Sequence, residues 1–314
     1  MLKKFLLGII LLLVAGGGAY VYLLNRPGPD MASLEAAYMK PADRFVDVDG
    51  LNVRVRDEGP RDAPVIVLMH GFIYSLETWD AWASELSKTY RVVRFDLAGH
   101  GLTGPDPKER YSAVERAAFV GEVMDALGIE HAVVGGNSLG GLAAWKFAVL
   151  APDRVDALIL VSAAGYEVNG VGDEPVEAPA AMKLFLKTAP AAGVEATLKK
   201  IFSDDSYVTP ERIELLGDMM RRDGNGDAFL ASIAEFTLPD PTTDLSSITA
   251  PTLIIWGEDD LVLPLDHGTR LHEAIAGSQL VIYPGVGHVP QEEAAEESVE
   301  VVIDFLGALD LEAP

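Results

Sequence analysis

The sequence contains no cysteine among its 314 residues. Without thiols the chain has no disulfide framework, no thiolate nucleophile, no cysteine-ligated metal and no lipid-modified cysteine. Histidine is also scarce, with six residues, and no H-E-x-x-H pattern or cluster of histidines and carboxylates has the spacing of a metal site. We therefore expect no metal and no other cofactor.

Basic residues are few, with 24 Lys and Arg against 48 Asp and Glu, which gives a net charge of −24. A chain this acidic repels phosphate backbones, and it has no local basic patch, so nucleic acid is excluded as a partner. The hydrophobic share of 49% excludes a disordered chain and predicts a packed core. The length fits one large domain or two small ones.

An uncharged apolar run is the most distinctive segment by composition. Residues 5–24 form 20 consecutive uncharged positions, which as a helix would span roughly 30 Å of hydrocarbon. We expect a single-pass membrane anchor here; a cleaved signal peptide is the alternative, with Gly17 and Ala19 as a possible cleavage site. Lys3 and Lys4 precede the run, which predicts a cytoplasmic N-terminus and a main domain on the exported, periplasmic or extracellular side.

The rest of the chain alternates between two kinds of pattern. Short, nearly continuous apolar runs predict strands at residues 65–69, 92–95, 132–134, 157–161, 252–256 and 280–283. Amphipathic segments of helix length lie between them, at residues 79–88, 112–127, 139–150 and 267–275. This alternation predicts a mostly parallel sheet with helices on both faces. Asp49-Gly50, a hairpin-turn dipeptide between residues 44–48 and 51–56, predicts an antiparallel hairpin at the start of the sheet.

One stretch interrupts the alternation. No strand pattern occurs in it, but helical patterns occur at residues 178–187, 193–201, 210–222 and 227–235. We interpret this stretch as a helical cap, an element that closes over a cleft and excludes water; ordinary surface helices are the alternative. The predicted organisation is an anchor at 1–24, a linker at 25–43, an α/β core at 44–165 and 245–314, and the cap at 166–244.

A candidate nucleophile lies in the motif Gly136-Asn137-Ser138-Leu139-Gly140. It has the form G-x-S-x-G, and it follows an apolar run and precedes a helical segment, which is the context that this motif requires. Glycines two positions on either side allow the strand and the helix to approach closely. A serine at a helix N-terminus is also close to backbone amides that stabilise developing negative charge. We therefore predict Ser138 as a nucleophile.

A serine hydroxyl needs a base that is itself oriented by a carboxylate, here in the chain order Ser, Asp, His. Three carboxylates, Glu258, Asp259 and Asp260, follow the predicted strand 252–256. We expect Asp260 to be the acid, with Asp259 as the first alternative and Glu258 as the second. His288 lies in a glycine-rich loop after the last predicted strand, which favours it as the base.

The remaining requirement is a pair of donors for an oxyanion. Phe72 follows His70-Gly71 at the end of another predicted strand, and we expect its amide and that of Leu139 to form an oxyanion hole. The other histidines are expected to be structural. We predict that His70 and His100, which lie in glycine turns, form hydrogen bonds with the backbone. We predict surface or helix positions for His131, His267 and His272.

Taken together, four motifs resemble those of a known superfamily. They are His70-Gly71-Phe72, the stretch Asp96-Leu97-Ala98-Gly99-His100-Gly101-Leu102-Thr103, the Ser138 motif, and the Asp260 and His288 loops. Their order is similar to that of the α/β-hydrolase superfamily, specifically its branch of capped serine esterases, haloperoxidase-like enzymes and C–C-bond hydrolases. In that family the second motif, D-x-x-G-x-G-x-S, is a structural turn, and Thr103 stands in place of its serine.

The resemblance implies an α/β-hydrolase fold and a small-molecule substrate. Relatives that are dehalogenases or epoxide hydrolases use an aspartate nucleophile, so Ser138 argues against both activities. Ile73-Tyr74-Ser75 lacks the extra glycines and proline common in C–C hydrolases, which favours a carboxylic ester. C–C-bond or lactone hydrolysis and acyl transfer with the same triad are alternatives, and a non-catalytic ligand receptor is an alternative of another class.

The cap carries apolar residues that either line an apolar acyl or alcohol pocket or form the cap's own core. They are Met182, Leu184, Phe185, Leu186, Phe202, Met219, Met220, Phe229 and Leu230. No oligomeric state follows from these patterns.

Overall fold

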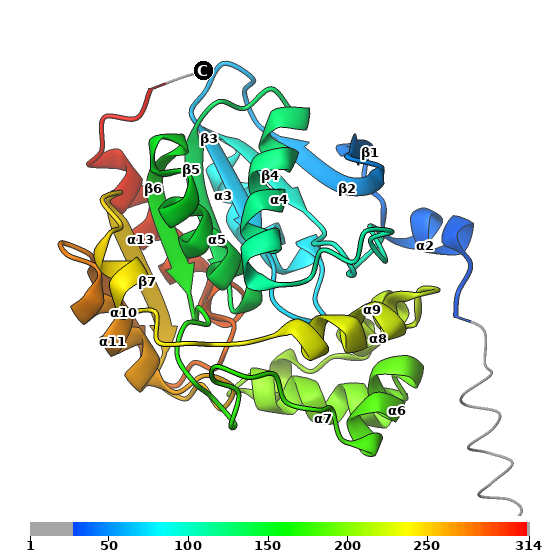
Figure 1. Ribbon diagram of the computed structural model, residues 1–314. Helices are drawn as coiled ribbons and strands as arrows, with labels where there is room; N and C mark the ends of the chain where they lie inside the picture. The colour runs from blue at the N-terminus through cyan, green and yellow to red at the C-terminus, as the bar shows by residue number, and fades with distance from the viewer. Residues whose placement is uncertain (1–27, 313–314) are drawn as a thin grey trace, which may run out of the picture.

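A computed structural model of the protein describes residues 28–312 and contains an eight-stranded sheet (Figure 1). The strands are β1 (Asp43–Val48), β2 (Leu51–Glu58), β3 (Val65–Met69), β4 (Arg91–Phe95), β5 (Ala132–Asn137), β6 (Val155–Val161), β7 (Thr252–Gly257) and β8 (Gln279–Tyr283). Their order is β1-β2-β4-β3-β5-β6-β7-β8. The pairs β1·β2 and β2·β4 are antiparallel and the others are parallel, which confirms the predicted sheet and its opening hairpin.

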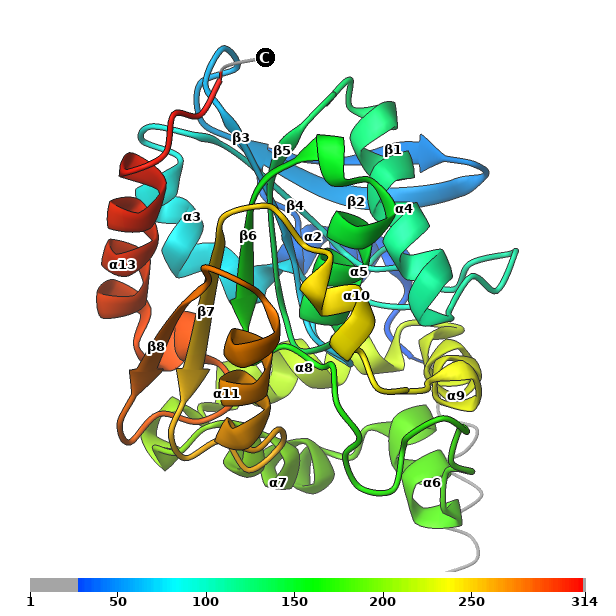
Figure 2. The same cartoon turned by 60° about the vertical axis from the view of Figure 1, so that its left-hand side comes forward.

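Helices cover both faces of the sheet, as predicted (Figure 2). One face carries α3 (Asp80–Leu86) and α13 (Ala295–Gly307), and the other carries α4 (Ala113–Ala126), α5 (Leu139–Leu150) and α11 (Leu265–Ala274). Because both faces are buried, successive side chains of β3 enter opposite cores: Ile66 and Leu68 pack with α3 and α13, and Val67 packs with α4 and α5. This double burial explains why the strands appear in the sequence as continuous apolar runs.

The residues between β6 and β7 form helices α6 (Ala180–Thr188), α7 (Ala191–Ile201), α8 (Pro210–Arg221), α9 (Asn225–Glu235) and α10 (Thr242–Ser246). We call α6 to α9 the helical insertion. It lies beside the ends of the sheet toward which the strand arrows of β6, β7 and β8 point (Figure 2). The insertion has a cluster of buried apolar residues, which includes Leu186, Val194, Leu198, Met220 and Phe229. Ile73 and Val289 of the α/β core belong to the same cluster. Several apolar residues highlighted by the sequence therefore pack within the insertion and against the core.

A short helix precedes the sheet. It is α2 (Met31–Tyr38), whose Leu34 is buried against Leu102 and Met219. The Tyr38 hydroxyl donates a 2.7 Å hydrogen bond to Asp218 in α8. Part of the predicted linker is thus a helix docked on the insertion. The predicted anchor, residues 5–24, lies outside the described residues; within 28–312 no helix has the length and apolarity to cross a membrane.

Hydrogen bonds of Asp96 and Thr103 hold the turn after β4 and connect it to β2 and to the segment after β3. The Thr103 hydroxyl donates to the Asp96 carbonyl oxygen and accepts a hydrogen bond from the Arg54 amide, both at 2.9 Å. The Asp96 carboxylate accepts hydrogen bonds from the amides of Leu76 and Leu102, both at 2.8 Å. The Thr103 hydroxyl thus both donates and accepts a hydrogen bond, at the position where the family pattern has serine.

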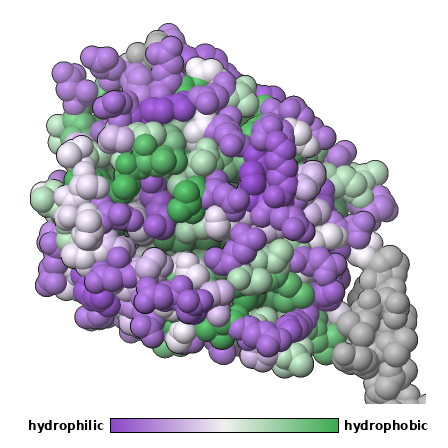
Figure 3. Space-filling model, viewed as in Figure 1, coloured by the Kyte–Doolittle hydropathy of each residue, from purple (hydrophilic) through white to green (hydrophobic). Residues whose placement is uncertain are grey.

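One face of the molecule is largely polar. On the face in Figure 3, hydrophilic residues predominate and apolar residues form smaller separate groups. Charged residues make up 23% of the sequence, which agrees with a polar face.

Candidate active site

Ser138 occupies a sharp turn between β5 and α5. Its backbone has φ 53° and ψ −114°, a conformation that is strained for a residue with a side chain. The flanking glycines are required sterically: a Cβ at Gly136 would lie 2.3 Å from the Gly140 carbonyl group, and one at Gly140 would lie 2.3 Å from the Met69 carbonyl oxygen. The turn places Ser138 at the N-terminus of α5, where backbone dipoles favour negative charge.

His288 and Asp260 form a buried pair. His288 Nδ1 lies 2.7 Å from Asp260 Oδ2, and the Asp260 side chain is fully buried. The other carboxylate oxygen of Asp260 accepts hydrogen bonds from the amides of Val262 and Leu263, both at 2.8 Å. Asp259, the alternative acid, is exposed. Asp260 is therefore the carboxylate that can orient His288 and fix which ring nitrogen carries a proton.

The His288 loop is held by two elements from elsewhere in the chain. Its amide donates a 2.7 Å hydrogen bond to the carbonyl oxygen of Ile201, the last residue of α7. Its carbonyl oxygen accepts a 3.1 Å hydrogen bond from the side chain of Asn137, which also donates to the Val161 carbonyl oxygen. Asn137 thus links the base loop to the strand that leads to Ser138. The motif contains Asn137, but sequence analysis assigned it no role.

The predicted oxyanion donors lie beside Ser138. A Cβ at Gly71 would be 3.2 Å from the Ser138 Cβ, so glycine permits the loop that carries Phe72 to pass close to the nucleophile. Phe72 and Leu139 both line a cavity with Ser138. Within residues 28–312, neither the Phe72 amide nor the Leu139 amide donates a hydrogen bond to a protein acceptor. Both amides are therefore free to bind a ligand oxygen.

His70 supports this loop as a neutral imidazole. Its Nε2 accepts a 2.9 Å hydrogen bond from the Leu97 amide, so the proton is on Nδ1, which donates to the Gly71 carbonyl oxygen at 2.7 Å. Complete burial lowers the pKa of His70 to about 4. The predicted backbone role of His70 is confirmed, and His100 likewise contacts the Ala98 carbonyl oxygen at 3.1 Å.

Within residues 28–312, the three other histidines form no hydrogen bond with Ser138, Asp260 or His288. His131 pairs with Asp156 at 2.7 Å, and His272 contacts the Ser278 hydroxyl at 2.9 Å. His267 is on helix α11, as expected, but it is buried rather than on the surface, because it packs against the Tyr166 ring. From the sequence alone, a single histidine in a helix does not show whether it lies on the buried or the exposed side.

Ser138 lies between two cavities. The first, of about 170 Å³, extends toward α9, and we call it the α9 cavity. It is lined by Phe72, Ser138, Leu139, Ala164, Val168, Asn169, Ser232, Ile233, Phe236, Leu238, Val262 and Leu263. The second, of about 210 Å³, extends toward α7 and is the α7 cavity. It is lined by Gly71, Phe72, Ile73, Tyr74, Asn137, Ser138, Thr197, Lys200, Ile201, Val262, His288 and Val289.

The structure thus brings all five predicted site residues together. Ser138 and His288 face the α7 cavity, Asp260 bonds to His288, and Phe72 and Leu139 border Ser138 in the α9 cavity. The apolar residues that actually line these cavities include Ile201, Ile233, Phe236 and Leu238. Among the described residues, none of the nine cap positions singled out from the sequence lines either cavity.

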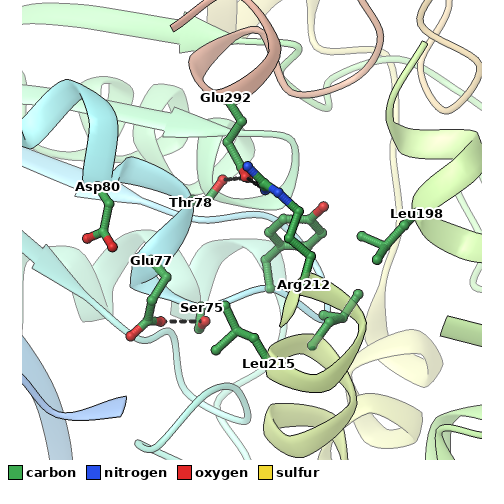
Figure 4. Close-up of a pocket in the computed structure, with 10 residues that line it drawn as sticks. Ser75, Glu77, Thr78, Asp80, Leu198, Arg212, Leu215 and Glu292 are labelled. Atoms are coloured by element: carbon green, nitrogen blue, oxygen red, sulfur yellow. Dashed lines mark hydrogen bonds and ion pairs between the residues drawn. The ribbon is translucent and has the colours of Figure 1, made fainter. Parts of the chain in front are cut away.

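A third cavity, of about 300 Å³, lies between α8 and the loop after β3 (Figure 4). Arg212 of α8 is turned toward Glu292, which also accepts a 2.5 Å hydrogen bond from Thr78. Burial raises the pKa of the Glu292 carboxyl, although the pair with Arg212 opposes that rise. Neither Ser138 nor His288 lines this cavity, and Tyr74 separates it from the α7 cavity by lining both.

Comparison with known proteins agrees with this geometry. A family model described as the alpha/beta hydrolase fold matches residues 64–295. The 2-hydroxy-6-oxo-6-phenylhexa-2,4-dienoate hydrolase of Burkholderia cepacia is 28% identical over 82% of this chain and 92% of its own length. Among solved structures, the meta-cleavage product hydrolase of Pseudomonas fluorescens is 27% identical, with a TM-score of 0.74 over 84% of this chain and 97% of that one. The enol-lactonase of Burkholderia xenovorans is 28% identical, with a TM-score of 0.72 over 84% of this chain and all (100%) of that one.

Proposed function

The chain belongs to the alpha/beta hydrolase fold family, and we propose that it is a serine hydrolase that cleaves carboxylic esters through an acyl-enzyme intermediate. One observation supports this proposal above the others. His288, hydrogen-bonded to the buried Asp260, lines the same cavity as Ser138. A serine, a neutral imidazole and an orienting carboxylate are the groups that acyl transfer requires.

In the proposed reaction, His288 takes the proton of the Ser138 hydroxyl as Oγ attacks the ester carbonyl carbon. The Asp260 carboxylate stabilises the imidazolium ion that forms. The negative oxygen of the tetrahedral intermediate accepts hydrogen bonds from the amides of Phe72 and Leu139. Collapse of this intermediate expels the alcohol, which receives its proton from His288. Water, deprotonated by the same imidazole, then releases the acid from Ser138.

The two cavities take different halves of the ester in this proposal. The leaving alcohol must be near His288 to receive a proton, so we assign it to the α7 cavity, which His288 lines. The acyl group then occupies the α9 cavity, which Ser138, Phe72 and Leu139 border. At about 170 Å³, this cavity is below the usual size of pockets for drug-sized ligands. We therefore expect short acyl groups to react faster than long ones.

A labelling experiment with matched variants tests the function. The full-length protein is incubated with a fluorophosphonate probe and with p-nitrophenyl esters from acetate to palmitate, beside Ser138→Ala, Asp260→Asn and Asp259→Asn. Labelling and ester turnover should disappear in Ser138→Ala, and kcat should fall about a thousandfold or more in Asp260→Asn. Asp259→Asn should behave as wild type because Asp259 is exposed. Ester turnover that persists in Ser138→Ala would refute the proposed nucleophile.

Hydrolysis of a carbon–carbon bond is the second candidate, favoured by the relatives whose names give meta-cleavage product and dienoate hydrolysis. The same triad can serve it. Labelling of Ser138 without turnover of any ester, together with cleavage of 2-hydroxy-6-oxo-6-phenylhexa-2,4-dienoate, would replace the ester proposal. An enol-lactone is included among the test substrates because one of the similar structures is an enol-lactonase. Saturable ligand binding without labelling or turnover would indicate a receptor.

We further propose that residues 5–24 anchor the protein in a membrane, with the hydrolase domain on the exported side. Support comes from the 20 consecutive uncharged residues. Gly28, the first described residue, has its Cα packed against the Arg221 carbonyl group of α8. The chain from residue 24 to residue 28 reaches about 14 Å when fully extended. A membrane at residue 24 would thus lie close to the helical insertion.

Deleting residues 1–24 should move the protein from the membrane fraction to the soluble fraction with its activity retained. A wild-type protein that is soluble without detergent would contradict the anchor.

A further inference from the structure

Arg116 is a buried cation without a carboxylate partner. It is 2% exposed, and its guanidinium group donates to the carbonyl oxygens of Tyr111 and Ala98 and to the Ser232 hydroxyl. Arg54 and Arg56, which are also buried, each pair with Asp43 and Glu77. Within residues 28–312, Arg116 forms no ion pair at all. Burial lowers the pKa of Arg116 to about 10 and outweighs the carboxylates of Glu235, Glu115 and Asp106, which favour this charge without forming an ion pair with it. A charge removed from water without a direct ion pair costs free energy, so its location calls for an explanation.

Ser232 connects this cation to the site. It is 3% exposed, lies on α9 and lines the α9 cavity. Its oxygen accepts a 2.8 Å hydrogen bond from Arg116 Nη2. In the described part of the chain the hydroxyl proton has no protein acceptor, so it is available to a ligand in the cavity. A hydroxyl whose oxygen binds a guanidinium ion is also a stronger donor than a free one, because the cation draws electron density from it.

The rest of the α9 cavity is mostly apolar. Apart from Ser138, the polar side chains that line it belong to Ser232 and Asn169. An acyl group extending from Ser138 into this cavity therefore meets apolar walls, formed by residues such as Ile233 and Leu238, and a donor backed by positive charge. A purely alkyl chain would leave that donor without an acceptor.

We propose that the α9 cavity selects acyl groups that carry a second oxygen acceptor, which binds the Ser232 hydroxyl while Arg116 acts as its positioning residue. The assignment of the acyl group to this cavity rests on the proposed ester hydrolysis. The substrate class is then the esters of oxo acids or the half-esters of dicarboxylic acids. A carboxylate in the cavity is also attracted by the charge of Arg116, with which no carboxylate of residues 28–312 forms an ion pair, so it should be preferred over a ketone of equal length.

Three p-nitrophenyl esters with five-carbon acyl groups test this selection in the full-length protein. They are the valerate, the 4-oxopentanoate and the glutarate half-ester, each corrected for its uncatalysed hydrolysis. In the wild type, kcat/KM for the two oxygen-bearing esters should exceed that for the valerate by about tenfold, the value of one net hydrogen bond. In Ser232→Ala the ratio should fall to about one. A merely structural role would lower all three rates and leave the ratio unchanged.

Two controls accompany this measurement. Ser246→Ala removes an exposed serine hydroxyl from α10 and should leave the wild-type ratio intact. Ser232→Thr keeps the hydroxyl and should restore the preference lost in Ser232→Ala. A wild-type ratio of one, or a preference that survives in Ser232→Ala, would overturn the proposal while ester hydrolysis itself stands.

Binding to Ser138→Ala tests the same cavity without catalysis. Calorimetric titration with glutarate, 4-oxopentanoate and valerate should show tighter binding of the first two by about tenfold, and the added Ser232→Ala change should abolish the difference. If no ester is hydrolysed but this Ser232-dependent binding is found, the proposed function fails and the selectivity of the cavity holds. Equal binding of all three acids would overturn the selectivity.

Discussion

The Asn137 side chain donates a hydrogen bond to the carbonyl oxygen of His288 across 3.1 Å. The same amide nitrogen donates to Val161 at the end of β6, also at 3.1 Å. The residue that precedes Ser138 therefore also holds the loop of His288. The position of the His288 loop relative to Ser138 is in this way tied to the backbone of the central strands.

Replacing Asn137 with Ala should lower kcat by about ten- to a hundredfold, because the His288 loop loses its bond to the strand and the imidazole is less well aligned. Two buried carbonyl oxygens also lose a donor, so the free energy of unfolding should fall by about 1–3 kcal/mol. Ester kinetics and urea denaturation measure the two effects. Asn52→Ala, at an exposed position of β2, is the control. Wild-type kcat in a destabilised Asn137→Ala would show that the bond has no part in alignment.

The backbone conformation of Ser138 should lower the stability of the folded protein. Its φ of 53° is costly for a residue with a Cβ and is accessible to glycine. Ser138→Gly should therefore be inactive yet more stable than Ser138→Ala by about 1 kcal/mol, since alanine keeps the strained Cβ. Denaturation midpoints of the two inactive variants provide the comparison. Equal midpoints would mean that the turn holds no measurable strain.

Thr103 should tolerate loss of its methyl group but not of its hydroxyl. The hydroxyl bonds to the Asp96 carbonyl oxygen and to the Arg54 amide in a fully buried turn. Thr103→Val should cost about 1–3 kcal/mol of unfolding free energy because both buried partners lose their hydrogen bonds. Thr103→Ser, which keeps both bonds, should cost less than half as much. Thermal unfolding of the pair decides the matter, and equal losses would point to packing of the methyl group instead.

His70 should make the protein less stable in acid. Burial lowers its pKa to about 4 in the folded protein, against about 6.5 for an unperturbed imidazole. Between these values the unfolded chain binds a proton that the folded chain does not, so the free energy of unfolding falls as the pH is lowered from about 6.5 to about 4. The loss attributable to this group reaches roughly 3 kcal/mol.

Urea denaturation of wild type and His70→Gln at intervals across this pH range tests that dependence. The glutamine cannot be protonated, so its stability should fall less steeply with acid. The buried His100 is present in both proteins, and its pKa is lowered mainly by burial, so most of its contribution is common to the two curves. Parallel curves for the two proteins would rule out His70 as the source of the acid sensitivity.

The sheet could be predicted from the sequence because its central strands are buried on both faces and their apolar residues are contiguous. Strand β5 shows the limit of this reasoning. It continues through Gly135, Gly136 and Asn137, which are typical of a turn in the sequence, and tertiary packing keeps them in the strand. Helix α13, at the end of the chain, is not among the helices predicted from the sequence.

The proposed catalytic residues could be located because each lies in a local motif at a strand end. Arg116, Ser232 and Ile201 could not, since their importance comes from contacts between segments that are distant in the sequence. Helical periodicity in the insertion indicated a buried face but not what it packs against. Phe229 packs against the rings of Phe72 and His100, whereas Ile233, one turn further along α9, lines a cavity.

The bond between the His288 amide and the Ile201 carbonyl oxygen joins the proposed base to the helical insertion. Any outward swing of α7 that admits a substrate must break this bond. With α7 swung outward, the His288 imidazole would be loosely held. With the imidazole held in place, α7 would be in its closed position. Access and reactivity would therefore alternate within each turnover.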